Sequence, residues 1–302
     1  MNVYLTGTSD DPLSHVVQHP LLTKELHLDL LGGLLTPQGQ ITVLSDQIVV
    51  MLAGALLLAI FLPLFVRRRQ DPTDEVGRLV PTGFGNLVEM ICQYLRDEVA
   101  KPNLGPHTDR FVKYLWTAFF FILTMNLLGL IPIGSVMPLL TGLHIGGTPT
   151  ANIFVTSTLA IMTFFLMVFY GLRLGGVDYL KHFNPGPPWI APLMVPLEII
   201  GTLAKVAALA VRLFAAMAGG HILLAVLVGL VLAAGSTLGL IKGLPVIVLI
   251  VVGSVAISLV ELFVAFLQAF IFTYLSALFI GMSVNVHHDD HDEGHLEGAP
   301  AH

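Results

Sequence analysis

Charged residues are scarce in this chain of 302 residues. Only 11% of the residues are Asp, Glu, Lys or Arg, whereas 55% are hydrophobic, and the mean hydropathy is +0.84. This balance excludes an ordinary soluble domain and predicts a protein that crosses a membrane several times. Of the 20 acidic residues, only Glu198 and Glu261 lie inside long apolar stretches.

The sequence also lacks the residue patterns of common catalytic sites. Cys92 is the only cysteine, so no disulfide can form within the chain. There is no Walker-type glycine loop, no HExxH pair, no Cys/His ligand set and no recognisable Ser/His/Asp arrangement. We therefore expect no enzyme acting alone, no cofactor and no metal site. The N-terminus shows no basic segment followed by an apolar core, so we expect no cleaved signal peptide.

Five apolar stretches are long enough to cross a bilayer, which takes about 20 helical residues. The stretches at 47–66, 114–133 and 153–172 each fit one crossing. Those at 189–232 and 245–286 would be roughly twice as long as the membrane is thick if they stood upright. We predict an all-α membrane protein with five transmembrane segments, in which the last two are long tilted helices that form an antiparallel hairpin.

The remaining segments flank these spans. Apolar residues recur at helical spacing within 83–100, which predicts an amphipathic helix on the membrane surface. Residues 1–46 are predicted as an external segment, 47–286 as a single membrane domain, and 287–302 as an acidic, His-rich cytoplasmic tail. We interpret the tail as solvated and disordered, because no ordered element fixes a spacing of metal ligands.

Basic residues predict the orientation in the membrane. Eight of the 14 Lys and Arg residues lie between the first and second spans, so this loop is expected in the cytoplasm. These eight are Arg67, Arg68, Arg69, Arg78, Arg96, Lys101, Arg110 and Lys113. Five crossings then place the N-terminus outside and the C-terminus in the cytoplasm.

The long apolar stretches carry two rows of polar side chains. Glu198, Lys205 and Arg212 are spaced by seven residues and form one stripe, and His221 points to roughly the opposite side of that helix. On the last helix, Ser254, Glu261 and Gln268 are also spaced by seven residues. In an antiparallel hairpin, one register places Arg212 level with Gln268 and His221 level with Glu261, nearer the outer face.

Structural explanations compete with functional ones for most of these residues. Lys205 can reach the membrane interface, Ser254 and Gln268 can hydrogen-bond between helices, and Glu198 can lie at a helix end. Arg212 is different, since it lies deep in the stretch and has no acid one turn away. An arginine at the bilayer centre costs about 2.5–3.5 kcal/mol, which favours a functional role.

Six motifs follow one another along the chain: "LRDEVAKPN", "MNLLGLIPIG", "TPTANIFVT", "PLEIIGTLAKVAALAVRLF", "RLFAAMAGGH" and "ELFVAFLQAFIFTYL". Together they resemble the F-type ATP synthase a subunit over nearly the whole chain. The essential arginine of that family falls on Arg212 and its motif glutamine on Gln268. Some members carry Glu and His where this chain has His221 and Glu261, and Ala216 replaces a common asparagine.

The resemblance implies a proton-conducting stator that couples proton flow to rotation and ATP synthesis in a bacterial inner membrane. Its implied partners are a c-subunit ring, b-type peripheral-stalk subunits and lipid, without nucleic acid. Arg212 is then the electrostatic gate between two offset half-channels, with Gln268 level with it. His221 and Glu261 form the relay of the outer half-channel, and Glu198 lines the inner one.

Weaker candidates and other classes of function stay open at this point. Asn126 and Asn152 are candidates for the outer water path, and Ser254 and Lys205 for channel lining, although local packing explains them as well. The alternative function is a standalone secondary transporter or ion channel, which also carries midplane charges but often shows paired repeats. A structural membrane anchor is the third class.

Overall fold

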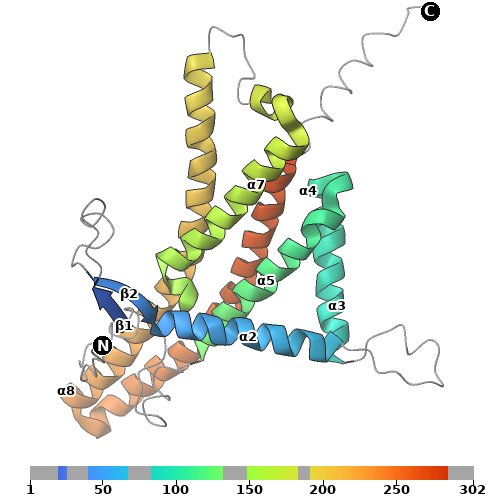
Figure 1. Cartoon of the computed structure of the whole chain (residues 1–302). Coiled ribbons are helices and arrows are strands. Elements are labelled where there is room, and N and C mark those ends of the chain that lie inside the picture. Colours follow the sequence, from blue (N-terminus) through green and yellow to red (C-terminus); the bar gives the residue numbers. More distant parts are fainter. Residues whose placement is uncertain (1–19, 26–39, 67–82, 132–147, 183–190, 285–302) are drawn as a thin grey trace, which may run out of the picture. The chain divides into compact units, whose positions relative to one another are not determined.

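The computed structural model describes residues 20–25, 40–66, 83–131, 148–182 and 191–284 (Figure 1). This part of the chain is almost entirely helical, which confirms the predicted fold class. The elements in chain order are β1 (Pro20–Glu25), β2 (Gln40–Ser45), α2 (Asp46–Val66), α3 (Phe84–Tyr94), the π-helix η2 (Leu95–Ala100), α4 (Lys101–Leu104), the 3₁₀ turn η3 (Gly105–His107), α5 (Thr108–Leu130), the 3₁₀ turn η4 (Pro149–Ala151), α7 (Ile153–His182) and α8 (Ala191–Val284). The predicted tail at 287–302 and the arginines at 67–69 lie outside the described residues.

Within the described residues, five helical segments are long and apolar enough to cross a membrane, the number that the sequence predicts. They are Asp46–Leu64, Phe84–Leu130, Ile153–Leu174, Pro192–Ser236 and Gly243–Val284. The predicted amphipathic segment at 83–100 is helical and forms α3 and η2. Its apolar side chains Phe84, Leu87, Met90 and Tyr94 are each more than 40% exposed within the described residues.

A short pair of strands precedes the first span and was not predicted. β1 pairs with β2 in antiparallel orientation, and α2 starts at the residue after β2 ends. Ser45 is the residue before the helix, and its Oγ accepts a hydrogen bond from the backbone N–H of Ile48 at 3.3 Å. This side chain therefore caps the start of α2 by satisfying one of its free backbone donors.

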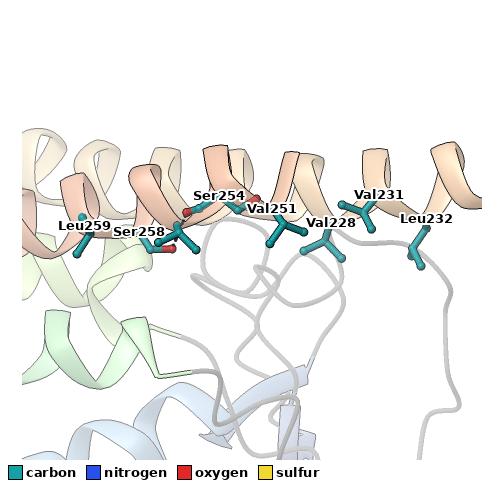
Figure 2. Close-up of a pocket in the computed structure, with 8 residues that line it drawn as sticks. Val228, Val231, Leu232, Val251, Ser254, Ser258 and Leu259 are labelled. Carbon is teal, nitrogen blue, oxygen red and sulfur yellow. Dashed lines mark hydrogen bonds between the residues drawn. The ribbon is translucent and has the colours of Figure 1, made fainter. Parts of the chain in front are cut away.

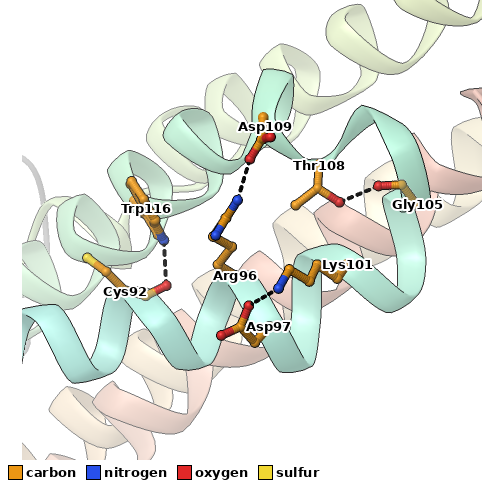
Figure 3. A network of polar contacts seen from close by, with 8 residues as sticks. All are labelled: Cys92, Arg96, Asp97, Lys101, Gly105, Thr108, Asp109 and Trp116. Atoms are coloured by element: carbon orange, nitrogen blue, oxygen red, sulfur yellow. Dashed lines mark hydrogen bonds and ion pairs between the residues drawn. The ribbon is translucent and has the colours of Figure 1, made fainter.

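The segment from α3 to α5 folds back on itself. Cys92 and Trp116 would lie about 36 Å apart along a straight helix, yet the Trp116 Nε1 donates to the Cys92 carbonyl at 2.9 Å. The chain turns at Gly105, whose φ of 52° favours glycine. A hydrogen-bonded ion pair joins Arg96 Nη2 to Asp109 Oδ1 at 2.8 Å across the turn (Figure 3).

The helix α8 also reverses direction along its length. A straight helix would separate residues 221 and 261 by about 60 Å, but His221 Nδ1 lies 3.6 Å from Glu261 Oε1. An apolar groove lies between the two limbs, with Val228, Val231 and Leu232 on one side and residues of 251–259 on the other (Figure 2). The orange part of α8 in Figure 1 contains this reversal, so the predicted hairpin is present.

The chain divides into two compact units. The first contains Met1–Ala59, Phe121–Val155 and Leu213–Gln268. Its described core includes a cluster of Ala151, Met217 and Ala218, with Phe214 packed against it. Small residues in this cluster allow close approach of the helices, as is common inside membranes.

The second unit contains Ile60–Phe120, Thr156–Arg212 and Ala269–His302. Hydroxyl groups join its helices, with Tyr114 Oη 2.7 Å from Thr163 Oγ1. An edge-on contact between the rings of Phe111 and Tyr170, 4.8 Å apart between centroids, adds to this packing.

Candidate functional site

The first unit contains a buried acid next to an imidazole. His221 lies on the first limb of α8 and Glu261 on the second, and their nearest polar atoms are 3.6 Å apart. The Glu261 side chain is 4% exposed and the His221 side chain is 18% exposed. Because both groups can gain and lose a proton, this pair can pass a proton between the two limbs.

The carboxyl group of Glu261 occupies a space left by a glycine. A Cβ atom added to Gly220 would lie 2.9 Å from the Glu261 Cδ, closer than real contacts allow. Within the described chain, neither carboxyl oxygen of Glu261 has a hydrogen-bond partner. A buried charge without such partners costs free energy, so His221 is the group that can compensate an ionised Glu261.

Asn126 on α5 is fully buried and joins two other segments. Its Nδ2 donates to the backbone carbonyl of Ala265 at 3.0 Å, one helical turn beyond Glu261. Its Oδ1 accepts a hydrogen bond from Thr150 Oγ1 at 2.8 Å. Asn126 therefore ties α5 and the η4 turn to the limb that carries Glu261.

Thr148, directly before the η4 turn, contacts the Nε2 atom of His221. The Thr148 Oγ1 is hydrogen-bonded to His221 Nε2, and the Thr148 residue is only 4% exposed. Farther along the same turn, Asn152 Nδ2 donates to Gln47 Oε1 at 2.7 Å. Buried polar side chains from α2, α5, the η4 turn and the second limb of α8 thus occur in one unit with the half-buried His221 on the first limb.

Two other candidates on the last limb have different surroundings. Gln268 is buried, and its Nε2 has no hydrogen-bond partner among the described residues. Ser254 lines the apolar groove and donates to the carbonyl of Ile250 on its own helix at 2.9 Å (Figure 2). A hydrogen bond within its own helix therefore accounts for the Ser254 hydroxyl, whereas the Gln268 Nε2 remains without a partner among the described residues.

The remaining candidates belong to the second unit. Arg212 and Lys205 are exposed and Glu198 is half-buried on α8. No acid of the described chain lies within ion-pair distance of the Arg212 guanidinium. Gln268 belongs to the first unit, so its predicted position level with Arg212 stays a prediction.

Sequence reasoning missed Thr148, Thr150, Gly220 and Gln47. The threonines lie in the motif "TPTAN" beside Asn152, so a polar cluster next to a named candidate was the available signal. The role of Gly220 had no signal, because the space that it leaves depends on packing between helices. Within the described ranges, no three His, Cys, Asp or Glu side chains are placed so that they could hold a metal ion together.

Comparison with known proteins identifies the family. The family model "ATP synthase A chain" matches residues 48–281. The chain belongs to this family.

Curated relatives agree with this assignment. The chain is 39% identical over 297 residues to "ATP synthase subunit a" of Myxococcus xanthus, covering 96% of this chain and 89% of that protein. It is 44% identical over 225 residues to the protein of the same name from Anaeromyxobacter dehalogenans, covering 72% and 53%. It is 41% identical over 225 residues to "ATP synthase subunit a 2" of Chlorobaculum tepidum, covering 74% and 58%.

Membership in the ATP synthase A chain family identifies a multi-pass membrane protein of the membrane sector that is not itself catalytic. The matched region contains the whole polar cluster of the first unit except Gln47, which directly precedes it. The cluster therefore lies within the part of the chain that defines the family.

Proposed function

We propose that the chain is the proton-conducting stator subunit of an F-type ATP synthase. It supplies two offset half-channels to a ring of c subunits, and proton flow through them turns the ring. The observation that carries this proposal is the pair of the half-buried His221 and the buried Glu261 inside the family region. Peripheral-stalk subunits of the b type hold the chain while the ring rotates, and other subunits make ATP.

In this proposal, His221 and Glu261 relay protons in the outer half-channel. Histidine exchanges protons near neutral pH, and the carboxyl group opposite its Nδ1 is the next group that can hold the proton. Asn126 and Asn152 offer polar side chains along the water path to this pair. Their hydrogen bonds to other segments hold these two polar side chains in place.

Arg212 acts as the gate between the half-channels. Its exposed guanidinium, without an acid of the described chain nearby, is available to a carboxylate on the rotor. A unit charge 4 Å away is worth about 4 kcal/mol at an effective dielectric constant of 20. That interaction keeps a passing rotor carboxylate ionised, so protons cannot cross directly. In this proposal Gln268 is the predicted partner of the gate, and Glu198 lines the inner half-channel.

The test is Arg212→Ala in the complete complex, compared with Arg173→Ala as a matched control. Arg173 is also an exposed arginine of the second unit, but it lies at the C-terminal end of the Ile153–Leu174 span. We expect Arg212→Ala to abolish coupled ATP synthesis and ATP-driven proton pumping while the c ring still copurifies. The Arg173 variant is expected to retain both activities. Coupled synthesis at the normal rate in the Arg212 variant would overturn the proposal.

A further inference from the structure

Thr148 approaches His221 on the side of the imidazole that faces away from Glu261. The Thr148 Oγ1 is hydrogen-bonded to Nε2, whereas Glu261 lies beside Nδ1. The two ring nitrogens of His221 therefore each have one neighbour of different chemistry. One neighbour is an acid, and the other is an uncharged hydroxyl.

The backbone holds this hydroxyl in place. Pro149 follows Thr148 and restricts it to extended conformations, in agreement with its φ of −87° and ψ of 117°. The Thr148 carbonyl accepts a hydrogen bond from the N–H of Ala151 at 3.0 Å, which closes the η4 turn. Thr148 is thus fixed at the start of a short turn instead of lying on a free loop.

A glycine on α5 provides the space for the side chain. A Cβ atom at Gly129 would overlap with the Thr148 side chain. Thr148 is consequently enclosed between α5 and the first limb of α8, and its hydroxyl points at the imidazole. Such enclosure leaves the side chain little freedom to turn away from His221.

A hydroxyl suits this place because it can both donate and accept a hydrogen bond. When His221 is protonated, both ring nitrogens carry hydrogen and Thr148 accepts from Nε2. When His221 is neutral with the proton on Nδ1, Thr148 donates to Nε2. The same side chain can therefore satisfy His221 before and after a proton transfer, without any movement of the backbone.

We propose that Thr148 is a positioning residue for His221, which orients the imidazole toward Glu261 and satisfies Nε2 in both protonation states. This inference rests on the proposed role of His221 as a proton relay. The proton itself passes through the imidazole and the Glu261 carboxyl group, and Thr148 neither gains nor loses one overall.

The test compares Thr148→Val, which keeps the shape but removes the hydroxyl, with Thr148→Ser, which keeps the hydroxyl. Passive proton conduction is measured in vesicles that contain the assembled membrane sector. We expect Thr148→Val to conduct about fivefold more slowly, the effect of losing one hydrogen bond of ordinary strength, and Thr148→Ser to stay near the unmodified rate. Thr117→Val is the matched control, because the exposed Thr117 hydroxyl donates only to the carbonyl of Lys113 on its own helix.

A second comparison separates positioning from packing and from the underlying function. His221→Gln alone should slow conduction, and adding Thr148→Val to it should cause no further loss, because the hydroxyl acts through the imidazole. Normal conduction in His221→Gln would overturn the proposed relay. Slow conduction in His221→Gln with normal conduction in Thr148→Val, or equal losses in the Val and Ser variants, would overturn only the role of Thr148. If Thr148→Val does not assemble with the ring, the smaller Thr148→Ala replaces it in the same comparison.

Discussion

At the scale of single residues, the environment of Glu261 is unusual for a buried polar group. Most buried polar groups in proteins have hydrogen-bond partners, yet both carboxyl oxygens of Glu261 have none among the described residues. Such a group is costly to keep for stability alone. A proton relay explains why the protein keeps such a group. Several hydrogen-bond donors would stabilise the ionised form of the carboxyl group, and it would then accept a proton less readily.

Glu261→Gln removes the ability of this site to exchange protons. Glutamine has nearly the same size and fits the space beside Gly220, but its amide cannot accept and release a proton in the relay. We expect proton conduction to fall more than tenfold, a loss typical of removing a general acid or base, while the amount of assembled complex changes little. Conduction assays on vesicles, with the c ring quantified in the same preparation, measure both.

Glu89→Gln is the control for this substitution. Glu89 lies on α3 and accepts a hydrogen bond from Gln93 at 3.3 Å, outside the polar cluster of the first unit. The same chemical change there should leave conduction unaltered. If Glu261→Gln conducts at the unmodified rate, Glu261 does not belong to the relay.

How far single residues could be predicted depended on whether helical geometry alone relates them. His221 and Glu261 lie on two limbs of one hairpin, so their spacing in the sequence placed them at one level, and the structure brings them together. Thr148 reaches His221 from a turn in another segment. No periodicity connects a turn to a helix, so only the three-dimensional structure shows this neighbour.

At the scale of elements, helices were predictable because the bilayer requires about 20 consecutive apolar residues in a span. The predicted stretch 114–133 nevertheless starts six residues after the first residue of α5, Thr108. The first turns of α5 are polar, and a hydroxyl contact from Thr108 Oγ1 to the Gly105 carbonyl at 2.6 Å stabilises their start. Apolarity marks where a helix crosses lipid, whereas its ends are set by such local contacts.

The docking of α4 against the last limb of α8 gives a prediction at this scale. A Cβ atom at Gly281 would overlap with the Asn103 carbonyl group, which belongs to the backbone and cannot rotate away. Gly281→Ala should therefore destabilise the packing by about 1–3 kcal/mol, the usual cost of overfilling a well-packed contact. Thermal denaturation of the purified complex measures this loss, with release of the chain from the ring as the signal.

Gly201→Ala provides the matched control for that experiment. Gly201 lies on the other limb of α8 in the same unit, and a Cβ atom there would meet nothing within 4 Å. This variant should be at least as stable as the unmodified complex, because alanine favours helices. Equal stability of the two variants would show that the backbone at 103 yields to accommodate the added methyl group.

At the scale of the whole molecule, the chain holds only part of what proton transfer requires. The described residues bring an acid and an imidazole together in one unit, but they offer Arg212 no acid of their own. A guanidinium in an apolar segment has to be compensated by something. We infer that its counter-charge comes from another subunit, in keeping with membership in a family that works inside a larger assembly.

The direction of proton flow depends on the orientation of the chain, which yields the last prediction. Most basic residues lie between the first and second spans, so this loop should face the cytoplasm, residues 1–46 the outside and the C-terminal tail the cytoplasm. A chain with Cys92→Ser and one new cysteine, Ser9→Cys or Ala299→Cys, can be treated with a membrane-impermeant maleimide. In right-side-out vesicles we expect labelling at position 9 and none at 299, with the opposite pattern in inverted vesicles.

Labelling of both positions from one side would require an even number of crossings and would contradict the five-span arrangement. Exchange of the two patterns would place His221 and Glu261 nearer the cytoplasm and make them part of the inner half-channel.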